Sequence, residues 1–392
     1  MLRDFPAAPP ARRERALSEV VDLFLELAAI PSPSGRERAV ADRVSRFLAD
    51  LRVAVHEDDA GPRIGSDCGN LIATIPATQV DGRGTPIFLC AHLDTVPPAP
   101  GCELLPVVEN GSIRNAGGTI LGADNKASVA VMLEAVRRIV VENRPHAGIE
   151  LLLTLQEETT LAGARVIDLD RVTAQVGFVY DQAGPIGEII VGAPHQTGVD
   201  LVFHGRAAHA GMFPEDGRSA IMAAARAIAA LPHGRIDPET TANVGVIQGG
   251  SALNVVADRC AVRIDLRSHD DSRLAALIRE VLDTAAWCAN EAGCTLESTV
   301  YETCPGYRMP PATDVVRIAQ QGLAAAGFEP RLAVTGGGAD TNELTRRGRR
   351  CITLSNGMAE IHTADEHIAV ADLEAMVEVT LALVECARAG GF

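Results

Sequence analysis

His92 and Asp94 stand at the end of residues 86–94, an apolar run of strand-forming residues. Residues at positions i and i+2 of a strand share a face, so this imidazole and this carboxylate can point the same way. A histidine can bind a metal ion while a carboxylate beside it fixes the tautomer and orientation of the ring. Alone, a His-x-Asp pattern at a strand end is more often part of the polar surface than a metal site. A metal site is favoured only if further metal-ligating residues lie nearby.

Further donor residues occupy corresponding places along the chain, where an apolar strand finishes or a helix begins: Asp124, Glu157, Glu158, Asp181 and His362. Because open α/β sheets place their sites at the carboxyl ends of the strands, we expect these side chains to meet at one rim. Any single one of these carboxylates is more often a solvated loop charge. Several on one rim would repel each other unless cations lay among them, which favours a metal site.

Glu157 and Glu158 are adjacent, and adjacent residues of a strand face opposite ways. Both can serve one site only if the strand has ended before them, which the following Thr159, Thr160 and Gly163 permit. One glutamate could then bind a metal ion, and the other could act as a general acid or base. Oxygen and nitrogen ligands without cysteine fit Zn²⁺, Co²⁺ or Mn²⁺, and a bridging carboxylate would hold two such ions about 3.5–4 Å apart.

The elements that must position these residues alternate between helices and strands. Helical spacing of apolar residues occurs at 16–31, 35–51 and 124–143, and strand-like runs occur at 53–55, 70–75, 149–155 and 177–180. Asp124 stands where the N-cap of the third helix belongs. The alternation predicts a mixed, mostly parallel sheet that is buried on both faces and flanked by helices.

After Pro194 the pattern changes to half-buried antiparallel strands at 197–204 and 261–267, with helices at about 219–231 and 271–288. Two strands and a helix, twice over, predict a small α+β domain with one open face. The α/β pattern then resumes with helices at 312–326 and 370–385 and strands at 331–334 and 351–354. We therefore expect one α/β domain at 1–195 and 309–392 and an inserted α+β domain at 196–308; by the resemblance described below, the first would be the catalytic domain and the second its lid.

Composition excludes several classes of protein. The formal charge of −16 argues against nucleic acid as a partner. No run of about 18 apolar residues exists, and residues 1–15 lack the apolar region of a signal peptide, so we expect no membrane partner. The nine cysteines include no Cys-x-x-Cys pair and fit neither a disulfide framework nor a zinc ribbon. A soluble protein of the reducing cytoplasm is the simplest interpretation.

Five short motifs occur in order along the chain: His92–Thr95, Gly122–Lys126, Gln156–Glu158, Tyr180–Asp181 and Ile361–Thr363. Together they resemble the site motifs of the peptidase T-like branch of the dimetal exopeptidases, a family that also includes carboxypeptidase G-like enzymes and aminoacylases. The resemblance runs from about residue 17 and includes Gly205–Gly211 and Gly336–Asp340. It implies two bound divalent metal ions, with zinc as the expected metal. It also implies a homodimer formed through the lid.

The resemblance also implies roles for the motif residues. Two ligand sets that share one aspartate would each hold a zinc ion: His92, Asp124 and Asp181, and Asp124, Glu158 and His362. Glu157 would be the general base, and Asp94 would orient His92. The peptide bond between Asp124 and Asn125 becomes a candidate for the rare non-proline cis form.

Three residues of the lid are expected to bind substrate by the same resemblance: His209, Arg267 and Asn254. Without the resemblance, His209 would be interpreted as a surface histidine. In related enzymes the matching histidine donates a hydrogen bond to the tetrahedral oxyanion, often from the partner subunit. Arg267 could be an exposed strand cation or could clamp a substrate carboxylate, which suits its planar fork. Asn125, Ser128 and Ala257 depart from the usual pattern, and none of these departures removes a ligand or the base.

The expected activity is hydrolysis of short peptides, with a tripeptide aminopeptidase as the first choice. An N-acyl amino acid deacylase or a carboxypeptidase of the same family is the alternative with the same chemistry. A non-catalytic binding protein is a third candidate, although such descendants usually lose ligands or the base, and here the full set is present.

Overall fold

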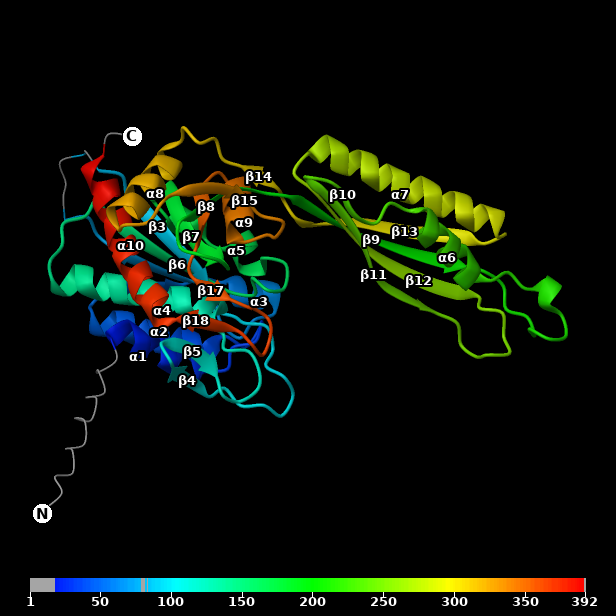
Figure 1. The fold of residues 1–392 in the computed structure, drawn as a ribbon, viewed down its shortest axis with the longest axis horizontal. Coiled ribbons are helices and arrows are strands. Elements are labelled where there is room, and N and C mark those ends of the chain that lie inside the picture. Colours follow the sequence, from blue (N-terminus) through cyan, green and yellow to red (C-terminus); the bar gives the residue numbers. More distant parts are fainter. Residues whose placement is uncertain (1–17, 79–81, 83, 391–392) are drawn as a thin grey trace, which may run out of the picture.

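The computed structural model describes residues 18–78, 82 and 84–390, and the lead at 1–15 lies outside this range. A layered body of helices around a sheet continues into a long antiparallel sheet with its own helices (Figure 1). The chain crosses between them at Pro194, after β8, and returns at Pro305 and Gly306, after β13. As a division into domains, the limits 195/196 and 308/309 stay a prediction.

The larger sheet runs in the order β1-β2-β6-β3-β7-β16-β8-β14, with β15 beside β8. Its strands are β1 Ala54–Glu57, β2 Leu71–Ile75, β3 Ile87–His92, β6 Ile149–Thr154, β7 Val176–Gln182, β8 Glu188–Ala193, β14 Tyr307–Arg308, β15 Arg331–Val334 and β16 Arg350–Ser355. The pairs β6–β3, β3–β7, β7–β16 and β8–β15 are parallel, and the others are antiparallel. The expected mixed α/β fold is confirmed.

Strand β3 shows why its sequence is continuously apolar. Ile87, Leu89 and Ala91 pack into the core on one face of the sheet, and Phe88 and Cys90 pack into a second core on the other. The first core lies under α1 Glu19–Ala28, α2 Arg38–Asp50, α4 Ala123–Val141, α8 Asp314–Ala325 and α10 Val370–Ala389, and the second lies under α5 Ala162–Val166, the 3₁₀ turn Leu169–Arg171 and α9 Asp340–Arg346. The short helix α3 Ala60–Ile64 packs against α5.

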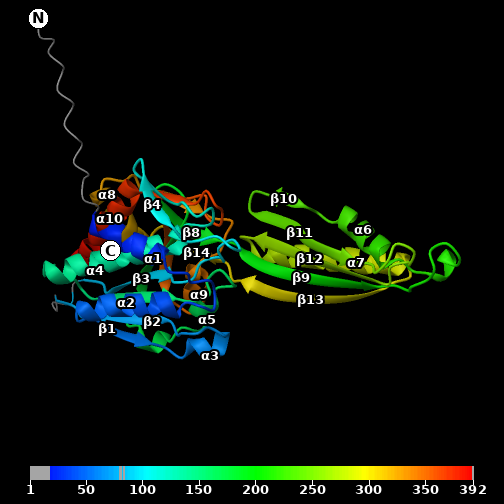
Figure 2. The same cartoon turned by 90° about the horizontal axis from the view of Figure 1, so that it is seen from below.

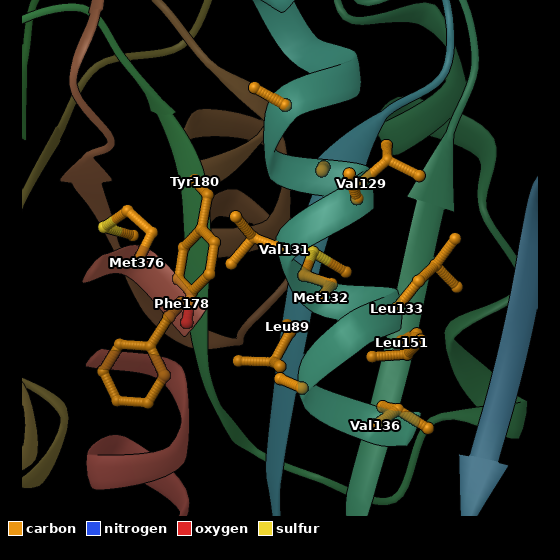
Figure 3. Close-up of a cluster of buried hydrophobic side chains, with 14 of the residues drawn as sticks. Leu89, Val129, Val131, Met132, Leu133, Val136, Leu151, Phe178, Tyr180 and Met376 are labelled. Atoms are coloured by element: carbon orange, nitrogen blue, oxygen red, sulfur yellow. The ribbon is translucent and has the colours of Figure 1, made fainter. Parts of the chain in front are cut away.

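Helix α4 lies along the centre of the first core, next to β3 and β7 (Figure 3). Its residues Val129, Met132 and Val136 are fully buried, as the helical spacing predicted. Each such side chain contributes about 1.5–3 kcal/mol by leaving water. The first turn of α4, which begins the site described below, is therefore fixed to the most deeply buried part of the molecule.

A small antiparallel sheet was not predicted from the sequence. It runs β17 Met358–Ala359, β18 His367–Ala369, β5 Ser112–Asn115 and β4 Pro106–Glu109. Strands of two to four residues are too short to show a periodic pattern. Their function is positional, because β17 and β18 bracket the turn that carries His362.

The lid sheet has five antiparallel strands in the order β10-β11-β12-β9-β13. They are β9 His195–His204, β10 Gly234–Asp237, β11 Thr240–Gly249, β12 Arg259–Ser268 and β13 Thr295–Cys304. Helices α6 Ala220–Ala230 and α7 Asp271–Glu291 pack on one face, so the other face is open. The sequence interpretation missed β10, β11 and β13, since these strands are mostly exposed or short and lack a buried stripe.

All nine cysteines lie in the described part of the chain and are free, as expected, and seven of them are buried. Among the helices between residues 18 and 390 that the structure describes, none combines the length and apolarity that a membrane crossing requires.

Candidate active site

The three neighbouring strands β6, β3 and β7 run parallel and end at one edge of the sheet. His92 is the last residue of β3, and Asp181 is the last but one of β7. Glu157 and Glu158 follow the end of β6, so the strand has indeed finished before them. The structure thus brings the donors of three strands together at one rim.

His92 is 1% exposed and faces two carboxylates. Its Nε2 lies 3.1 Å from Oδ1 of Asp124 and 3.5 Å from Oδ1 of Asp181. Burial alone would lower the pKa of His92, but the charge of Asp181 and the contacts with Asp124 outweigh it and raise that pKa well above its ordinary value. Burial also raises the pKa of Asp181 to about 6. These groups form the first set of donors.

His362 forms the second set with a different oxygen of Asp124. Its Nε2 lies 2.9 Å from Oε1 of Glu158 and 3.2 Å from Oδ2 of Asp124. Its hydrogen bonds with Asp124 and Glu158 raise the pKa of His362 to about 10. Asp124 therefore turns one carboxylate oxygen to each histidine, which is the arrangement of a bridging ligand.

Asp94 is fully buried and does more than face His92. The Nδ1 of His92 lies 2.9 Å from the main-chain oxygen of Asp94 and 3.4 Å from its carboxylate. That carboxylate accepts the main-chain N–H groups of Glu157 at 3.0 Å and Glu158 at 3.3 Å, and the hydroxyl of Ser34 at 2.6 Å. Asp94 thus fixes the loop of the two glutamates as well as the histidine ring.

The start of α4 differs from the predicted one. The N-cap is Gly122, and Asp124 lies inside the first turn with non-helical angles, so its assignment as N-cap was wrong. Its side chain is turned to the two histidines instead of capping the helix. The peptide bond between Asp124 and Asn125 is cis, which confirms that expectation. The amide of Asn125 donates to Asp181 at 3.2 Å, so this departure from the usual motif joins the cluster.

Glu157 lines two adjoining cavities of about 230 and 270 Å³, which it shares with Glu158, His362 and Gly338. Burial, with the charge of Asp181 added, raises the pKa of Glu157 well above its ordinary value. The smaller cavity is also lined by apolar side chains, namely Ala183, Met358 and Ile361. A carboxyl group poised between these cavities can exchange a proton with a molecule held in them.

The two donor sets fit divalent metal ions. Ligand atoms around one tetrahedral ion at about 2.0–2.2 Å lie about 3.3–3.6 Å apart. The nitrogen-to-oxygen distances within the two sets, 2.9 to 3.5 Å, are close to this spacing. Imidazole and carboxylate donors suit Zn²⁺, Co²⁺ or Mn²⁺. The chain therefore offers donor groups for two metal ions around His92 and Asp124.

The three lid residues lie in two different places. Arg267 lines the larger cavity together with Glu157, and its guanidinium donates to Gly336 and to Asp265. His209 and Asn254 are exposed and lie side by side, in the loop between β9 and α6 and the loop before β12. The first of these loops is at the end of the lid farthest from the catalytic sheet (Figures 1 and 2). Within one chain, His209 and Asn254 do not join the cluster.

Sequence reasoning missed three buried acids around the site, namely Glu37, Asp340 and Glu366. Glu37 accepts the N–H of Gln156 at 3.2 Å and the hydroxyl of Ser66 at 2.7 Å. Asp340 accepts hydrogen bonds from Thr154 and Cys90, and burial raises its pKa to about 7. For two of them the only signal was their position within or beside the motifs, because Glu366 follows His362 by four residues and Asp340 ends the Gly336–Asp340 stretch, whereas Glu37 lies in none of the motifs.

Comparison with known proteins agrees with this geometry. A peptidase dimerisation domain family matches residues 193–289, and peptidase family M28 matches residues 70–187. The crystal structure of aminopeptidase PepT from Bacillus cereus is 38% identical, with a TM-score of 0.87 over 94% of this chain and 98% of that one. A tripeptidase structure from Staphylococcus aureus is 33% identical, with a TM-score of 0.90 over 94% and 98%. The uncharacterized protein YqjE of Bacillus subtilis is 37% identical over 93% of this chain and 97% of its own.

The fold and the site thus define the class of the protein: it is a metallopeptidase with a two-metal site at the carboxyl ends of a mixed α/β sheet. This chain belongs to the peptidase T-like M20 family.

Proposed function

We propose that this chain is an aminopeptidase that hydrolyses tripeptides with two metal ions. The observation that carries the proposal is the pair of donor sets joined by Asp124, beside a half-buried Glu157 and a cavity that reaches Arg267. The relatives named as an aminopeptidase and a tripeptidase support this substrate class over an N-acyl amino acid. A non-catalytic role is disfavoured because the ligand and base residues are complete.

His92, Asp124 and Asp181 would hold one ion, and Asp124, Glu158 and His362 the other. We propose Zn²⁺ as the native metal, with Co²⁺ or Mn²⁺ as substitutes. Two such ions supply Lewis acidity, which polarises a scissile carbonyl and lowers the pKa of water. Asp94 would keep His92 in one tautomer and, through the N–H groups of Glu157 and Glu158, keep both glutamates in place.

Glu157 would act as general base and then as general acid. Its carboxylate would take a proton from the attacking water and give it to the nitrogen of the leaving amine. Arg267 lines the same cavity, and the contacts with Gly336 and Asp265 use two of its five N–H donors. The remaining donors would bind the terminal carboxylate of the dipeptide that leaves.

His209 would donate to the oxyanion from a partner subunit. Its Nδ1 accepts the N–H groups of Gly211 at 3.2 Å and Met212 at 3.1 Å, so the neutral ring carries its proton on Nε2. The ring is therefore prepared to donate a hydrogen bond. Since this loop lies far from its own cluster, a homodimer formed through the lid would bring it to the other subunit's site, and Asn254 would support it from the neighbouring loop. With nine free cysteines, the dimer would work in the cytoplasm.

Elemental analysis combined with a substrate panel tests the proposal. Purified protein should hold two divalent ions per chain and cleave tripeptides in preference to dipeptides and N-acyl amino acids. Asp124→Ala should lower the occupancy of both sites, whereas His362→Ala should empty mainly one. Activity that survives exhaustive chelation, or a preference for N-acyl amino acids, would contradict the proposal.

A further inference from the structure

Glu366 holds the loop that leads to Asp124. Its Oε2 accepts the main-chain N–H groups of Leu121 at 2.7 Å and Gly122 at 2.9 Å, and its Oε1 accepts that of Asp124 at 2.9 Å. The side chain is 1% exposed. Three converging N–H groups at the start of a long helix form a concave site that suits an anion, and a carboxylate is the side chain that can accept all three.

The backbone of this loop is shaped for the carboxylate. Gly122 has a φ of +77°, in the left-handed region that favours glycine. A Cβ added there would lie 3.3 Å from the Cγ2 atom of Thr95. The glycine therefore lets the loop turn its successive N–H groups toward Glu366, and the direction in which Asp124 leaves the loop depends on this turn.

Glu366 also belongs to the turn that carries His362. The N–H of Glu366 donates to the carbonyl of Thr363 at 3.3 Å, and the hydroxyl of Thr363 donates to the carbonyl of Glu360 at 2.7 Å. The next residues form β18, which pairs with β5. One side chain thus links the two loops that deliver Asp124 and His362, whose facing atoms are 3.2 Å apart.

We propose that Glu366 is a positioning residue for the shared metal ligand, which sets the approach of Asp124 to both histidines. The inference rests on the two-metal function proposed above. Because Asp124 belongs to both donor sets, loss of Glu366 should weaken both metal sites together. Loss of His362, which belongs to one set, should weaken mainly that one.

Glu150 provides a matched control. Its carboxylate is also buried, and it accepts the N–H of Thr173 at 3.1 Å, the hydroxyl of Thr173 at 2.9 Å and the N–H of Ala174 at 2.9 Å. It lies near the start of β6, at the opposite end of that strand from Glu157 and Glu158. Glutamine at either position removes the charge and replaces one accepting oxygen by a donor, so the two variants suffer a similar loss at different distances from the metals.

The experiment titrates Co²⁺ into metal-free full-length protein and follows heat release and the visible absorption of the bound ion. Glu366→Gln should weaken both binding events by about 10–100-fold and alter the absorption bands, because a displaced ligand changes the coordination. Glu150→Gln should match the wild type in both readouts while its melting temperature falls as much as that of Glu366→Gln. Unchanged Co²⁺ affinities in Glu366→Gln, or an equal loss in Glu150→Gln, would overturn the inference.

Three further outcomes separate the role of Glu366 from the proposed two-metal function. If Glu366→Gln fails to fold, Glu366→Asp keeps the charge but shortens the side chain, and it should still bind Co²⁺ more weakly at both sites; wild-type affinities in that variant would overturn the inference. If the wild type itself binds fewer than two Co²⁺ ions, the proposed function fails first. Two tightly bound ions in both the wild type and Glu366→Gln would refute the role of Glu366 alone.

Discussion

The catalytic sheet and the lid sheet hold their site residues in opposite ways. The catalytic sheet is buried on both faces, and its donor atoms stand about 3 Å from one another on strand ends and loops tied by buried acids. The lid sheet is covered on one face, and two of its three expected site residues, His209 and Asn254, lie in exposed loops away from the donor cluster. Double-sided burial suits a preorganised metal centre, whereas a one-sided sheet leaves side chains free to meet a substrate or a second subunit.

The largest effect is expected on the rigid side of this comparison. Glu157→Gln keeps the shape of the side chain and removes its basicity, so kcat should fall by about 10²–10⁴ while both metals stay bound. Steady-state kinetics and elemental analysis of the same sample check this. Glu158→Gln is the contrasting variant, since it should lose metal, and an unchanged kcat in Glu157→Gln would assign the proton transfer to another group.

On the lid, His209→Ala should lower kcat by about 10²–10³ with both metals retained, because one oxyanion donor is lost. If the donor comes from the partner, mixing this variant with Glu157→Gln should restore activity, since one site of the mixed dimer combines an intact Glu157 with an intact His209. The rate after subunit exchange is the measurement. No recovery despite proven exchange would mean that each lid serves its own chain, and a normal kcat in His209→Ala would exclude the lid from catalysis.

Arg267 lies where the two regions meet, and a smaller effect is expected there. Arg267→Lys keeps the charge but loses the planar fork, so KM for a tripeptide should rise about 10–100-fold with little change in kcat. Tripeptides with an amidated carboxyl end provide the control, because wild type and variant should then differ little. An equal KM increase for the amidated peptides would show that Arg267 does not bind the carboxylate.

The smallest effect concerns the open face of the lid sheet. Arg263 pairs there with Asp200 at 3.2 Å and donates to the hydroxyl of Tyr301 at 3.3 Å, on side chains open to water. Arg263→Met should leave the midpoint of urea denaturation almost unchanged, because an ion pair open to water contributes little to stability. A large shift of that midpoint would mean that this face is covered in the native assembly.

The sequence predicted the catalytic region well because most donors stand at the end of an apolar strand or at the start of a helix with a clear apolar pattern. The buried strands 149–155 and 177–180 and the helix at 124–143 correspond to β6, β7 and α4 within a few residues. The strand ends then locate the donors without knowledge of distant contacts. Asp124 as an N-cap was the exception, because a tertiary contact with two histidines displaced a local preference.

What the sequence did not reveal depends on tertiary contacts between segments without local signatures. Glu366 and Leu121 are far apart in the chain, and their hydrogen bond joins two irregular loops. Strands β11 and β13 are exposed, so they lack the one-sided apolar stripe on which the prediction of β12 relied. The position of His209, away from its own cluster, likewise follows from the direction of the whole lid and not from neighbouring residues.

The strand order of the catalytic sheet has a consequence for synthesis on the ribosome. Strand β16 sits between β7 and β8, although it is made after the entire lid. At a translation rate of about 5–20 residues per second, β16 is synthesised roughly 10–30 s after β7, and the edge of β7 stays unpaired until then. During this interval the lid, whose strands are contiguous in the chain, can fold while the catalytic sheet keeps an unpaired apolar edge. We expect nascent chains that end shortly after residue 304 to recruit chaperones and to aggregate on release, whereas chains that include β16 escape both.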